Sequence, residues 1–166
     1  MKTVFWIMLF TALPLGAQDT PLSAFSIKWE NSKKYLLEIA EAMPEKEYDF
    51  KPSERQMTFK EQLLHIQANI HWLGTTYFGM NPIDKVKENA GKEELIAYLE
   101  KTFVALGNTL KSIQSNALKE EVSFFAGPKT KLQILNLLQD HVTHHRGQLI
   151  VYINLNNITP PRYTGW

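Results

Sequence analysis

Apolar residues recur at alternating spacings of three and four along four segments of this chain, and that period predicts four amphipathic α-helices. The expected helices cover residues 22–43, 58–78, 92–115 and 130–156. Only Val122–Phe125 resembles a β-strand, and it is too short to organise a sheet. Four long helices of similar length predict an all-α fold, a four-helix bundle. The stripes of the first and last helices are Phe25, Trp29, Ser32, Leu36, Ile39 and Met43, and Leu135, Leu138, Val142, His145, Leu149 and Tyr152.

Residues that favour helix starts support these boundaries. Pro21 suits the first position of a helix, and Thr58 with Glu61 fits a capping box, in which each side chain satisfies a backbone donor. The connectors 44–57 and 116–129 are long enough for a crossover between helices. The order in which the helices pack stays open at this level.

The N-terminal segment has the features of a secretory signal peptide. Lys2 supplies a positive charge, an apolar run follows from Val4 to Leu13, and the small residues Gly16 and Ala17 precede the expected cleavage point. The predicted organisation is a signal peptide at 1–17 and one domain at 18–166. We expect export to a bacterial periplasm or the extracellular space, without stable membrane insertion after cleavage.

Composition excludes several functional classes. The chain has 166 residues, of which 44% are hydrophobic and 21% charged, as expected for one globular domain. Its formal charge of +1 and lack of a basic cluster argue against a nucleic-acid partner. The absence of cysteine excludes disulfides, thiolate metal ligands and a cysteine nucleophile.

Three histidines are the candidate chemistry. His141 and His145 are four residues apart in a predicted helix, so both rings leave the same face. His65, in the helix expected at 58–78, could complete a metal site. Three imidazoles would leave one coordination position for water or substrate, the arrangement of a catalytic site. The alternative is that these histidines are core residues with ordinary hydrogen bonds. Because Val142, not glutamate, follows His141, the His-Glu-x-x-His motif of metalloproteases is excluded.

Polar residues near the three histidines are candidates for orienting them. Glu61, Asn69 and Gln148 could each accept a hydrogen bond from the second nitrogen of a ligand ring. His144 lies about 60° from His141 around the helix, on the side away from His145, which favours an orienting or surface role over ligation.

Three further residues have simpler interpretations. His71 is six residues after His65, out of line with it, and is read as an interface or bundle-end histidine. Arg146 is expected to pair with an acid on a neighbouring helix rather than to bind an anionic substrate. Trp72 is expected to pack in the core rather than to wall a pocket.

Three motifs resemble those of the DinB/YfiT-like proteins. They are Phe59–Ala68 with its histidine, His141–Leu149 with its His-x-x-x-His-Arg-Gly-Gln run, and the segment from Tyr152 to Pro161. The resemblance implies a four-helix bundle that holds a divalent metal ion, often zinc or nickel, through three histidines. By position these are His65, His141 and His145, and homodimerisation is a further expectation.

The resemblance leaves three functional classes open. The leading one is a metal-dependent enzyme of hydrolase or thiol S-transferase type that acts on an unknown small molecule. The others are a non-catalytic metal-binding or stress-related bundle and a dimeric interaction protein. Some characterised relatives transfer low-molecular-weight thiols, which are cytoplasmic, so the signal peptide argues against assigning that activity to this chain.

Overall fold

The computed structural model describes residues 20–87 and 89–166, which form a four-helix bundle with one small hairpin. The signal peptide predicted at 1–17 and its cleavage point lie outside the described residues. The elements are α1 (Pro21–Ala42), η1 (Glu45–Glu47), α2 (Phe59–Phe78), α3 (Lys92–Lys111), η2 (Ser115–Lys119), β1 (Glu121–Val122), β2 (Lys129–Thr130) and α4 (Lys131–Leu155).

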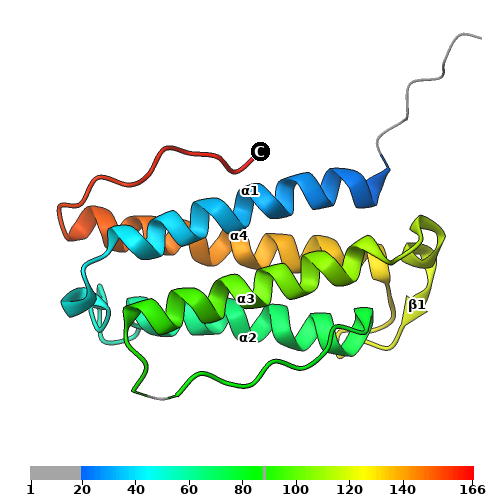
Figure 1. The fold of residues 1–166 in the computed structure, drawn as a ribbon, viewed down its shortest axis with the longest axis horizontal. Coiled ribbons are helices and arrows are strands. Elements are labelled where there is room, and N and C mark those ends of the chain that lie inside the picture. The colour runs from blue at the N-terminus through cyan, green and yellow to red at the C-terminus, as the bar shows by residue number, and fades with distance from the viewer. Residues whose placement is uncertain (1–19, 88) are drawn as a thin grey trace, which may run out of the picture.

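The helices pack in a closed ring in which α1 and α2 each contact both α3 and α4. Helices α2 and α3 run in the same direction, and the connector that joins them, described at residues 79–87 and 89–91, returns along the bundle beside them (Figure 1). The lengthwise crossover is therefore this connector, and neither 44–57 nor 116–129, the two segments that the sequence leaves long enough for one, forms it. Those two segments lie at opposite ends of the bundle, where each joins a pair of antiparallel helices (Figure 1).

Hydrogen bonds hold the start of α3 beside the start of α2 and the end of α1. The backbone N–H of Lys92 donates to Glu45 Oε1 at 3.0 Å, and Lys60 Nζ donates to the carbonyl of Ala90 at 3.2 Å. These contacts fix the far end of the crossover, so α3 must run parallel to α2. The sequence period cannot show this arrangement, because both helix directions bury the same stripe.

The helix starts follow from local chemistry. Thr58 and Glu61 form the predicted capping box, and Thr130 forms another with Gln133 at the start of α4. Pro21 occupies the first turn of α1, as predicted.

Helix α3 ends earlier than its apolar pattern suggests. The sequence predicts an end at residue 115, whereas the helix ends at Lys111. Ser112 donates its hydroxyl to the carbonyl of Thr109 at 2.7 Å, and its N–H bonds to the same carbonyl. A side chain that bonds a nearby carbonyl competes with helical continuation, and the chain tightens into a turn.

The core is built from the predicted stripes. All six stripe residues of α1 and all six of α4 are buried. The Trp29 ring stacks on Phe103 of α3 with ring centroids 4.5 Å apart, and its indole N–H donates to the Phe103 carbonyl at 3.1 Å. Because His145 belongs to the buried stripe of α4, a metal site that includes it would be enclosed by the bundle.

The short hairpin closes one end of the bundle. Glu121 pairs with Thr130 and Val122 with Lys129 in antiparallel register, so only the first residue of the predicted strand piece is in a strand. Tyr77 at the end of α2 donates to the Ser123 carbonyl at 3.2 Å. The turn that carries Phe124 and Phe125 consequently lies against the end of α2.

None of the helices in the described part of the chain combines the length and apolar character needed to cross a bilayer.

Substituting Gly107 in α3 with alanine should raise the free energy of unfolding by about 0.5–1 kcal/mol, measured by urea denaturation. A methyl group there would lie 3.5 Å from Glu30 Oε1 and 3.6 Å from Trp29 Cδ1, which is ordinary contact. The matched control is Gly79→Ala: Gly79 has φ of 74°, so alanine there should cost about 1 kcal/mol. Equal effects of the two substitutions would contradict this account.

Candidate metal centre

The structure brings His65 of α2 together with His141 and His145 of α4. These helices are antiparallel neighbours, and one ring nitrogen from each histidine lies within 4.8 Å of the others. The ring centroids are 4.8 Å apart for His65 and His141, 4.6 Å for His65 and His145, and 4.4 Å for His141 and His145. Among residues 20–87 and 89–166, this is the one group of three or more such side chains that could hold a metal ion.

The closest approach in the cluster fits a shared metal ion. The Nε2 atoms of His65 and His141 are 3.1 Å apart. Two nitrogens that bind one tetrahedral zinc at 2.0–2.1 Å would be about 3.3–3.4 Å apart. A small adjustment of the side chains would therefore place both nitrogens on one ion.

A chain of hydrogen bonds fixes which nitrogen of His145 carries its proton. The Tyr152 hydroxyl donates to the Met57 carbonyl at 2.8 Å, so its oxygen is left to accept from Gln62 Nε2 at 3.3 Å. Gln62 Oε1 then faces His145 Nδ1 at 2.6 Å and accepts a hydrogen bond from the Nδ1–H group. The neutral ring therefore keeps a lone pair on Nε2, the nitrogen available to a metal ion.

A branch of the same network extends to the surface. Gln62 Nε2 also donates to Gln148 Oε1 at 2.6 Å, and Gln148 Nε2 bonds His144 Nε2 at 2.8 Å. Gln148 thus orients His145 only indirectly, through Gln62. His144 is exposed and outside the three-histidine group, in agreement with the surface or orienting role predicted for it.

The other two predicted orienting residues do not perform that role. Glu61 accepts from the backbone N–H of Thr58 at 2.7 Å and serves the start of α2. Asn69 Oδ1 is buried without a hydrogen-bond partner in the described chain, and so is His141 Nδ1. The second nitrogen of His141 is therefore not held by a protein group as that of His145 is.

Burial and mutual repulsion keep the two α4 imidazoles neutral near pH 7. The pKa of His141 is lowered to about 4, mainly by burial and to a lesser extent by the neighbouring His145, His65 and His144. Burial likewise lowers the pKa of His145 to about 4, with smaller contributions from His65 and His144. Neutral imidazole is the form that binds metal ions, so few protons must leave when an ion binds at neutral pH.

The metal-free protein should lose stability as the pH falls from about 6.5 to about 4. In this window the unfolded chain binds protons at His141 and His145 that the folded chain does not, so protonation favours unfolding. Water screening of the half-buried His141 reduces the combined effect to about 1–3 kcal/mol. Urea denaturation at several pH values should show this fall, and His141→Gln should reduce it. If the free energy of unfolding of His141→Gln fell with pH as steeply as that of the parent, the low pKa of His141 would be contradicted.

Arg146 does not make the predicted ion pair. It is buried, its Nη1 donates to Ser32 Oγ at 3.3 Å, and its guanidinium lies 5.2 Å from the centre of the Tyr35 ring. No ion pair within the described residues includes it. Arg146 points toward α1, away from His65, because it follows His145 by one residue and so leaves α4 on another face.

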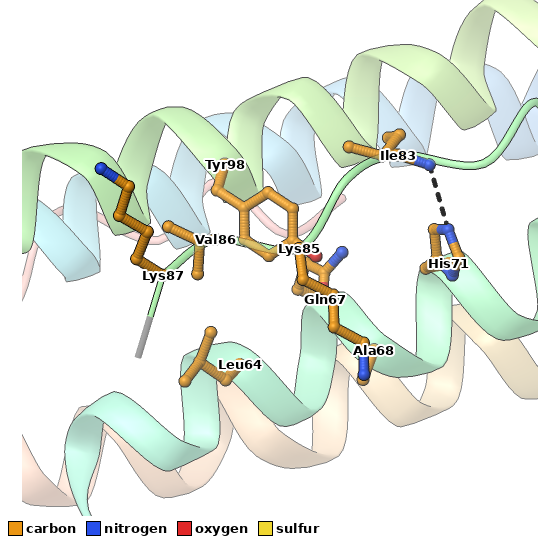
Figure 2. A pocket seen from close by; sticks show the side chains of 9 residues that line it. All are labelled: Leu64, Gln67, Ala68, His71, Ile83, Lys85, Val86, Lys87 and Tyr98. Atoms are coloured by element: carbon orange, nitrogen blue, oxygen red, sulfur yellow. Dashed lines mark hydrogen bonds between the residues drawn. The ribbon is translucent and has the colours of Figure 1, made fainter. Parts of the chain in front are cut away.

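His71 belongs to a separate feature on the α3 side of α2. Its Nε2 accepts from the backbone N–H of Ile83 at 3.1 Å, as Figure 2 shows, and so holds the crossover connector. The cavity beside it has a volume of about 300 Å³ and is lined by Leu64, Gln67, Ala68, His71, Ile83, Lys85, Val86, Lys87 and Tyr98. The predicted structural role for His71 agrees with this contact.

Trp72 walls a pocket, and its expected place in the core is wrong. The side chain is 41% exposed and nearly parallel to the rings of Phe124 and Phe125, at centroid distances of 6.0 and 6.3 Å. These three rings line a cavity of about 610 Å³ to which His141 also contributes. Trp72 faces outward because the face of α2 that packs against the other helices is narrower than the pattern of apolar residues suggests.

The sequence interpretation missed Gln62 and Tyr152 as members of the site. Gln62 precedes His65 by three residues and so shares its face of α2, a signal that could have been used. The link from Tyr152 to Met57 spans 95 positions and depends on helix packing, so no local pattern indicates it.

Comparisons with known proteins agree on one family. The family model described as the DinB family matches residues 19–165. YjoA of Bacillus subtilis (strain 168) is 30% identical over 121 residues, which cover 70% of this chain and 78% of YjoA. Crystal structures of DinB-like proteins from B. subtilis (YjoA) and Bacillus cereus ATCC 10987 superpose with TM-scores of 0.73 and 0.69, at 20% and 18% identity. Each covers 86% of this chain, and the alignments span 99% and 95% of those structures.

Proposed function

Because this chain belongs to the DinB family, we propose that it is a metal-dependent enzyme in which His65, His141 and His145 bind one divalent ion, zinc or nickel. The observation that carries the proposal is the convergence of three ring nitrogens within 4.8 Å from two antiparallel helices. Neutral rings and a fixed tautomer at His145 supply the ligand chemistry that such an ion needs.

The proposed reaction is hydrolysis or thiol transfer on a small molecule. A divalent ion with three protein ligands lowers the pKa of a water or thiol bound in the remaining position. The chain's own contributions are orientation and enclosure. Gln62 holds the His145 ring, while Trp72 and Phe124 form an apolar wall beside His141.

We also propose that the chain is exported and acts as residues 18–166. An exported enzyme does not meet the cytoplasmic thiols that some relatives use, which favours hydrolysis over thiol transfer. Mass spectrometry of the secreted protein should give an N-terminus at Gln18, and retention of Lys2 in that protein would contradict the proposal.

A non-catalytic metal site is the second candidate. The three histidines connect α2 with α4, so a bound ion could stabilise the bundle without any reaction. A tightly held ion that exchanges no exogenous ligand, together with a large loss of melting temperature on chelation, would favour this candidate. An exchangeable ligand would favour the enzyme.

The first test is metal content. Residues 18–166 would be stripped with a chelator, loaded with zinc or nickel, dialysed and measured by elemental analysis. Near one ion per chain supports the proposal, and well under one ion per chain contradicts it. We also propose that the chain forms a homodimer, as the family resemblance implies, and sedimentation equilibrium on the same samples would test this.

A further inference from the structure

The cavity beside His141 has an unusual concentration of exposed aromatic surface. Phe125 is 84% exposed, the highest value among the large apolar side chains of the described chain, and Trp72 is 41% exposed. Both belong to the lining of the cavity of about 610 Å³. Exposed aromatic groups gathered at one concave site indicate a surface that something covers.

The three rings form a contiguous aromatic cluster. Phe124 and Phe125 have centroids 4.3 Å apart with their planes tilted by 41°, and the Trp72 plane is inclined by 26° to Phe124 and 29° to Phe125. Tyr77 supports Phe124 from α2 at 6.1 Å. A cluster of aromatic rings at a cavity favours an aromatic ligand through offset-stacked and edge-to-face contacts.

The turn that carries the phenylalanines is held in place. The β1–β2 pairing closes it at its base, and the Lys129 ammonium bonds the carbonyls of Ala126 and Pro128, each at 3.2 Å. Tyr77 ties Ser123 to α2. The aromatic wall is therefore a formed part of the fold beside the candidate metal centre.

Charge does not select the ligand at this cavity. Its lining carries one basic side chain, Lys129, and one acidic side chain, Asp140, and the remaining members are neutral apart from the titratable ring of His141. Ile134 and Leu137 of α4 and the amide side chains of Asn69, Gln133 and Asn136 complete the lining. Recognition would then come from apolar and aromatic contact, from these amides and from the metal centre that includes His141.

We propose that this cavity binds the aromatic body of the substrate, with a metal-binding polar group of the same molecule directed toward His141. The inference rests on the proposed metal centre and specifies its substrate class: a small molecule with an aromatic ring adjacent to an oxygen-bearing reactive group. A volume of about 610 Å³ accommodates one or two fused rings with substituents. A second copy of the chain is the competing occupant.

The test compares probes that share one metal-binding group. Zinc-loaded protein of residues 18–166 would be titrated calorimetrically with acetohydroxamate, cyclohexanecarbohydroxamate and benzohydroxamate. We expect benzohydroxamate to bind at least about tenfold more tightly than acetohydroxamate and more tightly than the cyclohexane compound. Trp72→Ala should remove most of that gain and leave acetohydroxamate binding within about twofold, because only the aromatic end is lost.

Trp166→Ala is the matched control, since Trp166 is 64% exposed and lies outside the cavity. This variant should bind all three probes as the parent does. Equal affinities for the three probes, or a gain that survives Trp72→Ala, would overturn the aromatic assignment while leaving the metal centre intact. Failure to bind zinc would overturn both, and a dimer that Trp72→Ala dissociates, with no preference for benzohydroxamate, would identify a second copy as the occupant.

Discussion

Replacing His145 with alanine should reduce zinc affinity by at least about a hundredfold, and His141→Ala should do the same. Each substitution removes one of three ligands. The two ring nitrogens that remain hold a zinc ion much more weakly than three do. His145 has the larger expected effect because its ring is buried and its tautomer is fixed by Gln62. Competition titration against a chromophoric chelator at pH 7 would give the dissociation constants.

The two remaining histidines provide matched controls. His144→Ala and His71→Ala remove the same side chain from exposed and half-buried positions outside the cluster, so their zinc affinity should stay within about threefold of the parent. Circular dichroism would show that all four variants retain the helical fold. Parental zinc affinity in His145→Ala, or an equal loss in His144→Ala, would refute the three-histidine assignment.

Replacing Gln62 with leucine should weaken zinc binding about 10–100-fold without removing any ligand. Leucine has a similar volume but accepts no hydrogen bond, so the proton of His145 is no longer held on Nδ1. The metal-binding Nε2 would then carry the proton in part of the population. Nitrogen-15 chemical shifts of the His145 ring in the metal-free protein would report that tautomer directly.

Gln67→Leu is the control for loss of a buried glutamine from α2. Gln67 is buried like Gln62, but its amide donates to Thr102 of α3 at 3.2 Å, on the other side of the helix. This substitution should lower stability without changing the tautomer or zinc affinity. Tyr152→Phe should shift the tautomer in the same direction as Gln62→Leu but by less, because Gln148 still restrains the amide. An unchanged tautomer in Gln62→Leu would disprove the hydrogen-bond argument.

Much of the fold and of the candidate site could be predicted from local patterns. A three-four period reports the buried face of a helix, and Trp29, Leu138 and Tyr152 are buried where that period places them. A spacing of four residues places His141 and His145 on one face whatever the rest of the chain does. His65 on the facing helix completes the predicted set, while His71 on the same helix lies outside the cluster.

The wrong predictions for Trp72 and Arg146 concern contacts between elements. Trp72 fits the apolar pattern of α2 yet faces the hairpin turn, since the width of a buried stripe depends on which helices flank it. The sequence predicts an acidic partner for Arg146, whereas its side chain contacts Ser32 and Tyr35 on α1. Neither outcome can be read from the neighbours of these residues in the chain.

The sequence by itself determined the four helices, their buried faces and the three histidines, because each is a property of spacing within one element or of a short motif. Only the tertiary structure decided that the connector from α2 to α3 runs along the bundle, that Met57 fixes the proton of His145 through Tyr152 and Gln62, and that an aromatic turn lies beside His141. These features join residues far apart in the chain, and their distances follow from how whole helices pack rather than from the propensities of any one segment.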